Sequence, residues 1–547
     1  MDTSTAVAFI IAGLIVVSYC ANWQTRWKYR HIPGPPPSFP MGNLKTIKQK
    51  EVFRAHQDWS AQYGDICKVF MMRKAVILVT DPAVVHQIAT KQFSRFRDRY
   101  MPAIDNPLLS GRARQAAQST MIVAKSPLWG SLRAGAQPMF HSENLSAYAG
   151  TINKAVDELM TNLSTVAKSG KEVNIFSQLG QMTMQVTGAA AFGVDLQCQQ
   201  EASKQDGMLL SAAKTVFASS NTFNPSFWMV AAMLAPPPLL PLIRFLASVL
   251  PGKALLQVLQ AFDTMYDVSA SLIQNSKAKL NNTGKEPSDW LWFKRNPNNP
   301  YLDTTPSDNS IIPMLLKANT KATGTPLTDL QIGAQTSIIM LAGYETTSVA
   351  LTYCIYLLSK HTQVQQKLLQ EVDDFRGQPS YEQLDHFPYA AAVLNEALRL
   401  FPPAPLFARV AHQDAQIGPY AVPKGTVVYA GLYTMHRDKR WWEHAEAFKP
   451  ERWLGDETGG DKSGGLAYMP FGLGPRKCIG YKLAVEEAII ALVRLYQQFT
   501  FELSGNCQEP LDIKMGITMA PRGGMPVHVR QRVRTWNDSV SAAQATA

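Results

Sequence analysis

The chain has 547 residues, of which 46% are hydrophobic and 17% charged, so it is long enough for one large core or for two domains. Its six cysteines lie far apart, with no C-x-x-C pair and no cysteine and histidine cluster at zinc spacing. This argues against a zinc site and a disulfide framework and fits a reducing compartment. The formal net charge of +11 suits an anionic membrane surface or an acidic protein partner; because no basic run is interleaved with aromatic residues, nucleic acid is the weakest partner class.

The N-terminal segment predicts a membrane anchor. Residues 3–25 carry no charge and are just numerous enough to span a bilayer as a helix. A cleaved signal peptide is the alternative, because small residues stand at cleavage-like spacing near Cys20. However, Asp2 precedes the segment, and the residues that follow it are basic, namely Arg26, Lys28, Arg30 and His31. This asymmetry favours an uncleaved single transmembrane helix over residues 1–25, with the body of the protein in the cytosol.

The next segments predict a linker and then a folded body. Residues 26–42 are basic and proline-rich, and the run 32–37 cannot continue a helix. Residues 66–72 and 75–80 are typical of a strand pair, and Asp81 with Pro82 marks the start of a helix. A helical pattern extends from about 144 to 213. The last residues, 535–547, are polar and predict a disordered tail.

A second apolar stretch covers residues 223–243. Its prolines forbid a continuous membrane-spanning helix. Two interpretations stay open for it. One is ordinary core packing, and the other is a segment in the membrane interface that lines an entrance for lipophilic substrates.

A long helix is predicted to begin in the run Thr325–Thr328 and to continue to about Lys360, roughly 50 Å at the usual rise per residue. Midway, the small residues Ala342 and Gly343 permit the close approach of a flat group. An acid and a hydroxyl follow at Glu345 and Thr346 in an otherwise apolar span. Alone, this pair is most often a satisfied polar step in a core helix, in which a hydroxyl bonds back to the preceding turn. A proton relay is the functional alternative.

Glu396 and Arg399 lie three residues apart on one face of a predicted helix. The pattern E-x-x-R alone is a weak signal and usually marks a surface ion pair. A second arginine, Arg452, follows some fifty residues later in the run FKPERW.

Near the C-terminus, one cysteine stands in a turn-forming run of glycine and proline. Residues 470–480 read PFGLGPRKCIG, and a helix-forming segment begins directly behind them at Tyr481. Backbone N–H groups at a helix N-terminus have no intrahelical partner, so they can hold the Cys478 sulfur as a thiolate. Without such neighbours, a lone cysteine is usually a small buried hydrophobe. The spacing F-x-x-G-x-R-x-C-x-G, from Phe471 to Gly480, resembles the cysteine-ligand loop of the cytochrome P450 superfamily.

The resemblance implies haem b as the cofactor, with the Cys478 thiolate as the axial ligand of its iron. Other residues would bind the haem: Phe471 beside the sulfur, Ala342 and Gly480 at close approaches, and Trp129, Arg133, Arg409 and Arg476 toward its propionates. His436 is a weaker candidate on the propionate side, and its alternative is a loop histidine bonded to backbone. Glu345 and Thr346 would act as a catalytic proton relay. Glu396, Arg399 and Arg452 would form a buried structural network behind the haem.

The family also implies a fold and a function. The fold would be mainly α-helical with a small, β-rich N-terminal lobe, behind a single N-terminal transmembrane helix and with the catalytic domain over residues 43–534. The function would be a monooxygenase that uses O2 on a lipophilic small molecule, anchored in the endoplasmic reticulum membrane. The sequences around Cys478 and Ala342 most resemble those of the animal drug- and steroid-oxidising branch and of thromboxane synthase.

Electrons must come from another protein, because the chain has no dinucleotide-binding G-x-G-x-x-G after a strand. The expected donor is an acidic NADPH-dependent reductase, with cytochrome b5 left open as a second donor. Its expected docking face consists of Lys439, Arg440, Lys477 and Lys482. Two alternatives stay open: a haem-thiolate isomerase or dehydratase that rearranges peroxides without a reductase, and a membrane-tethered haem sensor. Substrate identity would depend on residues 100–125, on the stretch after Phe223 and on the turn after Phe401.

Overall fold

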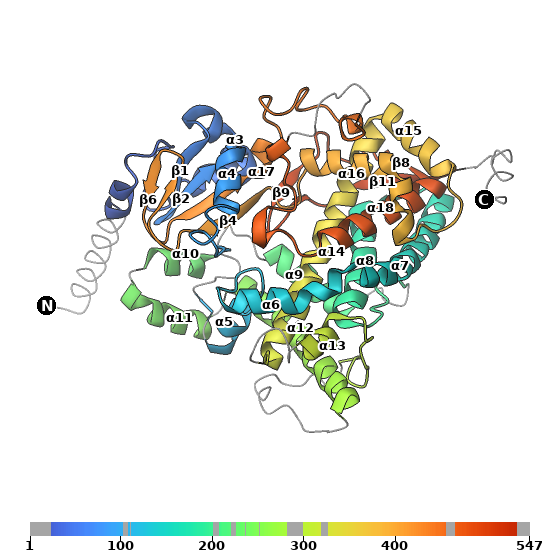
Figure 1. Ribbon diagram of the computed structural model, residues 1–547, viewed down its shortest axis with the longest axis horizontal. Coiled ribbons are helices and arrows are strands. Elements are labelled where there is room, and N and C mark those ends of the chain that lie inside the picture. Colours follow the sequence, from blue (N-terminus) through green and yellow to red (C-terminus); the bar gives the residue numbers. More distant parts are fainter. Residues whose placement is uncertain are drawn as a thin grey trace.

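The computed structural model of the protein describes residues 23–101, 108–109, 111–200, 207–219, 226–235, 237–250, 252–281, 299–318, 326–455 and 465–532. Helices make up most of these residues, and the strands form small sheets (Figure 1). The predicted mainly α-helical class is therefore confirmed. The anchor predicted over residues 1–25 lies almost wholly outside the described residues, and so does the tail 535–547.

The helices have the following bounds: α2 Leu44–Lys50, α3 Val52–Tyr63, α4 Pro82–Ala89, α5 Gly111–Gln118, α6 Leu128–Ala136, α7 Ser142–Ser169, α8 Ile175–Phe192, α9 Met208–Ser219, α10 Phe227–Leu234, α11 Leu240–Val249, α12 Lys253–Asn281, α13 Ile311–Ala318, α14 Asp329–Lys360, α15 Thr362–Asp373, α16 Pro388–Leu400, α17 Leu432–Met435 and α18 Tyr481–Gln498. The Asp81 carboxylate caps α4 by accepting bonds from Ala83 and Val84 N–H, as the sequence predicted.

The largest sheet contains β1 (Ile66–Met71), β2 (Lys74–Val79), β7 (Val427–Gly431) and β4 (Leu406–Val410), in that spatial order. The predicted hairpin of β1 and β2 is confirmed, and Met71 pairs with Lys74. β2 pairs in parallel with β7, and β4 runs antiparallel to β7. The expected N-terminal lobe needs a correction, because half of this sheet comes from residues 406–431. A parallel pair requires a crossover, and most of the helical body forms it.

The remaining strands form short antiparallel sheets. β3 (Glu172–Asn174), β11 (Pro526–Gln531) and β8 (Phe499–Leu503) form one sheet, β5 (Ala415–Ile417) pairs with β6 (Tyr420–Val422), and β9 (Ile513–Met515) pairs with β10 (Met519–Pro521). The β9–β10 hairpin lies near the middle of the molecule, where β10 contacts α14 (Figure 1). It therefore reaches the core rather than the outer surface.

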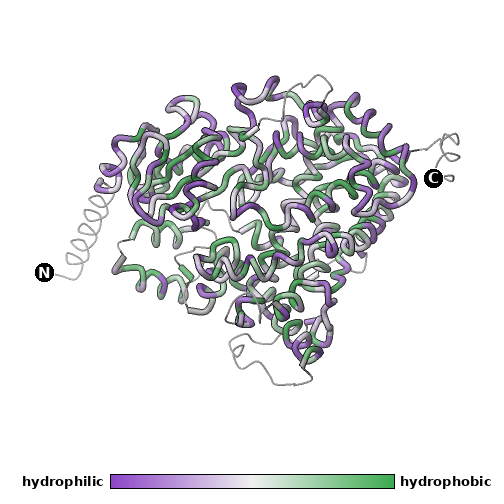
Figure 2. Tube along the Cα trace, in the orientation of Figure 1, coloured by the Kyte–Doolittle hydropathy of each residue, from purple (hydrophilic) through white to green (hydrophobic). Residues whose placement is uncertain are grey.

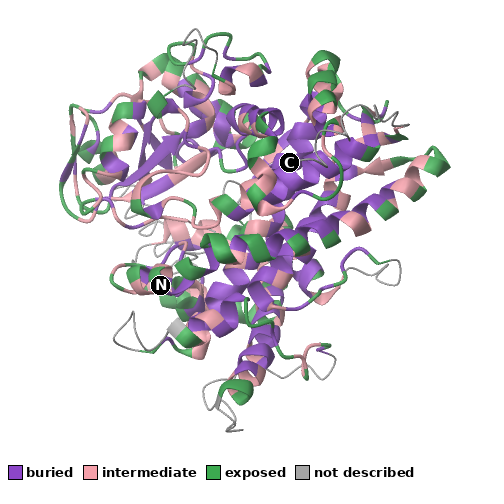
Figure 3. Ribbon diagram, turned by 45° about the vertical axis from the view of Figure 1, so that its right-hand side comes forward, coloured by how far each residue is buried: buried purple, intermediate pink, exposed green. Residues whose placement is uncertain are grey.

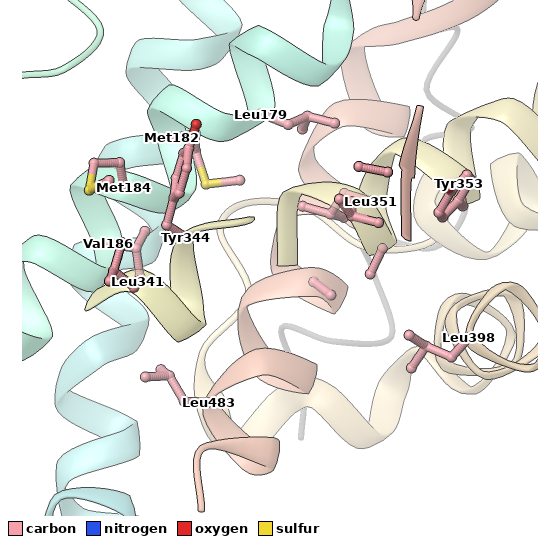
Figure 4. Packing of buried hydrophobic residues seen from close by; sticks show 14 of the residues in the cluster. Leu179, Met182, Met184, Val186, Leu341, Tyr344, Leu351, Tyr353, Leu398 and Leu483 are labelled. Atoms are coloured by element: carbon pink, nitrogen blue, oxygen red, sulfur yellow. The ribbon is translucent and has the colours of Figure 1, made fainter. Parts of the chain in front are cut away.

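Helix α14 is the central element of the core. It begins where predicted, because the Thr328 hydroxyl and the Gln331 side chain form a reciprocal capping box. Met182 and Val186 of α8 lie beside Tyr344 and Leu341 of α14 (Figure 4). α14 is long and apolar enough to cross a membrane, but 78% of its most apolar window is buried in protein. It is thus a core helix, and Figure 3 shows it and its neighbours as mainly buried.

Helices α10 and α11 form the second predicted apolar stretch. As expected, its prolines divide it into short helices. Several large apolar side chains project into solvent, with exposures of 76% for Phe227, 62% for Phe245 and 64% for Leu250. In Figure 2 this hydrophobic segment lies on the same side of the molecule as the first described residues of the chain. Within the predicted stretch itself, Phe227 and Leu242 are exposed, whereas Val230, Met233 and Leu234 pack against the main core. Core packing is therefore confirmed for part of the stretch and wrong for its exposed side chains.

Candidate functional site

The loop before α18 presents Cys478 at a helix N-terminus. Cys478 N–H donates to the Phe471 carbonyl at 2.9 Å, and Gly480 is the N-cap of α18. Gly472 and Gly474 both have φ of 72°, which L side chains rarely adopt. A Cβ on Gly474 would also lie 2.0 Å from the Ala89 carbonyl oxygen. The glycines at these positions are thus required by backbone shape and by close packing.

The environment of the Cys478 thiol is mixed. Desolvation raises its pKa, whereas a Gly480 N–H bond and the cations Arg99, Arg133 and Lys477 oppose that rise. The residue is nevertheless accessible to solvent. An accessible side chain that is closely surrounded by protein faces an internal space rather than the outer surface. The N–H bond and the nearby cations are groups that stabilise a thiolate.

A second accessible position lies on α14. Ala342 is exposed although its neighbours Leu341 and Tyr344 are buried. Protein therefore does not fill the space beside the middle of this core helix. Because α14 packs against α18, the helix that follows Cys478, the two accessible residues belong to adjacent core elements.

The acid and hydroxyl of α14 have separate partners. The Thr346 hydroxyl donates to the Ala342 carbonyl at 2.6 Å, which is the backbone-directed bond expected of a helical threonine. Glu345 is buried, and its Oε1 accepts a hydrogen bond from the Thr518 hydroxyl. Burial raises the pKa of Glu345 to about 7, although the Thr518 bond and Lys514 act in the opposite direction. Near neutral pH this carboxyl can therefore both give and take a proton.

Arg476 uses its guanidinium donors on backbone oxygens. Its nitrogens donate to the carbonyls of Arg97 at 2.9 Å, Met121 at 3.2 Å and Ala124 at 2.8 Å. The guanidinium carbon also lies 4.2 Å from the centre of the Trp129 ring. Arg476 thus joins the cysteine loop to the segment that precedes α6, and its charge is added to the surroundings of the site.

Two more arginines lie near Arg476, the partly buried Arg99 and the buried Arg409. Burial is the main cause that lowers the pKa of Arg476 to about 9 and that of Arg99 to about 10. Burial also lowers the pKa of Arg409 strongly, and Arg99 and Arg476 add like-charge repulsion. The Arg409 Nε is buried and has no hydrogen-bond partner within the described residues. Within the part of the chain that the structure describes, Asp98, 3.5 Å from Arg476, is the one acid paired with this cluster, although buried cations require negative charge.

Sequence reasoning missed Arg99 as a member of this cluster. It lies in the run Arg97-Asp98-Arg99, whose alternating charges also suit a solvated surface. The predicted Arg133 does lie near, and it donates to the Lys477 carbonyl at 3.0 Å. The arrangement fits an anionic group, because such a group would neutralise several desolvated cations together.

Glu396, Arg399 and Arg452 lie together in a fully buried network. Arg399 donates to both Glu396 oxygens, at 2.8 and 2.9 Å, and Arg452 Nε donates to Oε1 at 3.0 Å. The Trp453 indole and the Lys449 N–H also donate to this carboxylate. Arg399 in addition bonds the carbonyls of His436, Ala445 and Ala447. The network therefore ties α16 to residues 436–453.

His436 is buried beside this network, and burial lowers its pKa to about 3. Its Nε2 accepts a bond from the Met469 N–H at 3.2 Å. The structure thus places it as a histidine bonded to backbone, which was the alternative left open above.

Comparison with known proteins decides the family. The cytochrome P450 family model matches residues 32–527, nearly the whole chain. The chain belongs to the cytochrome P450 family. Human cytochrome P450 3A5 is 28% identical over 531 residues, which cover 96% of each chain. Mouse cytochrome P450 3A13 is 29% identical over 537 residues, 97% of each chain. Rat thromboxane-A synthase is 26% identical over 559 residues, 97% of this chain and 98% of that one.

As a cytochrome P450, the protein is a monooxygenase oxidoreductase with haem b as its cofactor, and its cytochrome P450 relatives use O2, lipophilic substrates and redox partners. The relatives match the suspected branch, and enzymatic activity argues against the sensor alternative. The residues present fit haem: an accessible Cys478 at a helix N-terminus, an accessible Ala342 on the adjacent core helix, and buried cations that lack counter-charge for the propionates.

Of the four residues expected to form the reductase docking face of this cytochrome P450, Arg440 is paired with acids of the protein itself. Arg440 binds both Asp65 oxygens, at 2.7 and 2.8 Å, and also pairs with Asp438. Its charge is therefore offset within the protein, and it is a weak choice for contact with a partner. Lys477 lies 3.8 Å over the Tyr481 ring, next to the cysteine loop.

Proposed function

We propose that this cytochrome P450 inserts one oxygen atom from O2 into a lipophilic small molecule, with electrons from a separate NADPH-dependent reductase. The observation that carries the proposal is the pairing of an accessible Cys478 with an accessible Ala342, one turn before a buried acid and a hydroxyl. Cys478 would ligate the haem iron. Phe471, Gly480, Ala342, Trp129, Arg133, Arg409 and Arg476 would bind the haem, joined by Arg99.

The chain's own groups have distinct tasks in this mechanism. Bound haem supplies the activation of dioxygen. Desolvation raises the pKa of Cys478, whereas the Gly480 N–H and the nearby cations favour the thiolate that would bind the iron. Glu345, with its pKa near neutrality, holds a proton at its carboxyl and takes up another from solvent after release. Thr346 presents its hydroxyl on the same turn of α14 and completes the relay. The buried network of Glu396, Arg399 and Arg452 keeps the surrounding backbone in place.

The ligand assignment is tested by the spectrum of the reduced protein with carbon monoxide. Cys478→Ala should lose haem or at least the thiolate signature. Cys507→Ala removes a buried cysteine away from the loop and should keep both. A Cys478→Ala protein with an intact thiolate signature would remove Cys478 from the site.

The relay is tested by the ratio of product to NADPH consumed. Thr346→Ala should release peroxide in place of product, because the hydroxyl is lost where protons are delivered. The matched control is Thr352→Ala, since Thr352 makes the same back-bond to its helix, to Ser348 O at 2.6 Å. Equal coupling in both variants would exclude Thr346 from the relay.

A peroxide-rearranging isomerase is the second candidate, because thromboxane-A synthases are among the relatives. Such a reaction needs no reductase and no proton relay. Turnover of lipid peroxides without NADPH, unaffected by Glu345→Gln, would favour it. Product formation that requires both NADPH and reductase favours the monooxygenase.

We further propose that the protein lies in the endoplasmic reticulum membrane and that the segment 1–25 anchors it there. The linker 26–42 would join this anchor to the catalytic domain 43–534, which would face the cytosol and end in the tail 535–547.

The reductase docking face would consist of Lys439, Lys477 and Lys482, and cytochrome b5 could bind the same cations. Reversing these three charges should lower turnover and its salt dependence. Reversing Arg440 should have a smaller effect on docking, because Asp65 and Asp438 already offset its charge.

The substrate class can be identified by titrating the haem-bound protein with sterols, fatty acids, terpenoids and aromatic drugs while the spin state of the iron is followed. A low-to-high-spin shift with one class would identify the ligand that displaces distal water. No shift with any class would favour the peroxide candidate.

A further inference from the structure

Thr518 contacts the acid of α14 from a distant part of the chain. It lies between β9 and β10, and its hydroxyl donates to Glu345 Oε1. Both side chains are nearly inaccessible, with exposures of 3% for Thr518 and 9% for Glu345. A hydrogen bond between two buried groups is specific, because neither can exchange its partner freely for bulk water.

The hairpin that carries Thr518 is held in place by bonds that do not involve Glu345. The Tyr353 hydroxyl donates to the Met519 carbonyl at 2.9 Å, and the Met519 N–H donates to the Pro403 carbonyl at 2.8 Å. Within the hairpin, the Gly516 N–H donates to the Thr518 carbonyl at 2.9 Å. Bonds to α14 and to the turn after Phe401 therefore hold the backbone that carries Thr518, independently of Glu345.

Few other charged or titratable groups act on the Glu345 carboxyl. Lys514 on β9 attracts it, and the buried Tyr353 hydroxyl lies near it on α14. The Ser348 hydroxyl bonds the Glu345 carbonyl and not its carboxyl. Thr518 is thus the one hydrogen-bond donor to this carboxyl among the contacts of the described residues. The bond engages Oε1, so that Oε2 is the oxygen left for proton exchange.

We propose that Thr518 is a positioning residue for proton delivery: its hydroxyl sets the orientation and proton affinity of Glu345 and links the β9–β10 hairpin to the relay on α14. This inference rests on the proposed function, in which Glu345 holds the proton. It adds a residue that no motif in the sequence indicated, since Thr518 is 173 positions away from Glu345.

The test compares Thr518→Val, which keeps the shape without the hydroxyl, with Thr518→Ser, which keeps the hydroxyl. The first readout is the infrared carboxyl band of Glu345 in the resting protein, assigned by its loss in Glu345→Gln. It should move in Thr518→Val and stay in Thr518→Ser. Tyr353→Phe is the control for the hairpin frame, because it removes a different buried hydroxyl of the same region.

The second readout is the pH dependence of coupling between NADPH consumption and product. Since the Thr518 bond lowers the pKa of Glu345, its loss in Thr518→Val should move the midpoint up by about one pH unit. Thr518→Ser should keep the midpoint at its wild-type pH, because the hydroxyl is retained. In the Glu345→Gln background, Thr518→Val should have no further effect on coupling.

An unchanged carboxyl band and an unchanged midpoint in Thr518→Val would overturn the inference. If Glu345→Gln lowers coupling while Thr518→Val does not, only the role of Thr518 fails. If Glu345→Gln leaves coupling unchanged, the relay itself fails, and the inference fails with it.

Discussion

At the scale of single residues, the site depends on groups whose charge or accessibility is unusual for a protein interior. Cys478 and Ala342 are accessible between core helices, and Arg99, Arg409 and Arg476 are desolvated cations. Such groups cost folding free energy unless a ligand compensates them. The same residues are therefore those at which stability and function are most closely connected.

Glu345 should make stability depend on pH. Its pKa is about 7 in the folded protein and 4.5 ordinarily, so unfolding releases a proton between these values. The free energy of unfolding from this group falls as pH rises from 4.5 to 7 and stays level above 7. A glutamine side chain in place of Glu345 does not titrate. The difference in free energy of unfolding between Glu345→Gln and wild type, measured by urea unfolding, should therefore shift in favour of the variant by about 3 kcal/mol from pH 4 to pH 8.

The control for this measurement is Glu382→Gln. Hydrogen bonds from Ser146 and from nearby groups lower the pKa of the exposed Glu382. Because its folded pKa lies below 4.5, the contribution of Glu382 to stability changes only below about that pH. Glu382→Gln should therefore keep the wild-type pH dependence between pH 4.5 and 7, and loss of that dependence in Glu382→Gln would contradict the assignment to Glu345.

The Glu396 network should be sensitive to loss of its shared acceptor. Glu396→Ala leaves Arg399 and Arg452 buried without their carboxylate, so we expect a loss of about 3–5 kcal/mol in the free energy of unfolding. Glu502→Ala breaks an exposed pair with Arg530 and should cost about 1 kcal/mol or less. Comparable losses in the two variants would show that the network has no special structural role.

At the scale of elements, close packing of α14 against α8 defines the middle of the core. A Cβ on Gly343 would lie 2.3 Å from Cγ2 of Thr187, so the two helices approach too closely for a larger residue. The motif indicated small residues here for contact with a flat cofactor. The structure shows that the neighbour of Gly343 is another helix, whereas Ala342 is the accessible position.

Gly343→Ala should destabilise the protein by about 1–3 kcal/mol, because the added methyl overpacks this contact. Thr187→Ser removes the clashing methyl and keeps the hydroxyl that bonds Thr183 O at 2.8 Å. The double variant should therefore recover most of the loss in thermal unfolding, which is a coupling between neighbours. Additive losses in the double variant would place the strain elsewhere.

At the scale of the whole molecule, the apolar surface of α10 and α11 lies on the same side as the N-terminal end of the described chain (Figures 1 and 2). Exposed Trp23 and Trp27 stand at that end, with exposures of 59% and 53%. Aromatic residues at this spacing suit a membrane interface. Both surfaces could therefore contact one bilayer.

A fluorophore at Phe245→Cys should be quenched by brominated lipids in vesicles that carry the full-length protein, because this side chain would enter the interface. The matched site is Glu502→Cys on β8, an exposed position on the opposite side of the molecule (Figure 1). The labelled parental protein provides the background. Equal quenching at both sites would mean that α11 stays in water.

The sequence by itself determined the elements with strong local signals. The Thr328 capping box, the Asp81 cap, the β1–β2 hairpin and the turn before α18 all depend on residues within a few positions of one another. The spacing around Cys478 was specific enough to indicate the family. These features require no knowledge of distant contacts.

Only the tertiary structure decided which distant groups meet. The pairing of β2 with β7, the bond between Thr518 and Glu345, and the crowding of Arg99 with Arg409 and Arg476 join residues that lie far apart in the chain. The sequence near a threonine in a hairpin, or near an arginine in a charged run, does not indicate which distant residue that side chain contacts. Such contacts are selected by the packing of the whole core, because burial and chain crossover are properties of the complete fold.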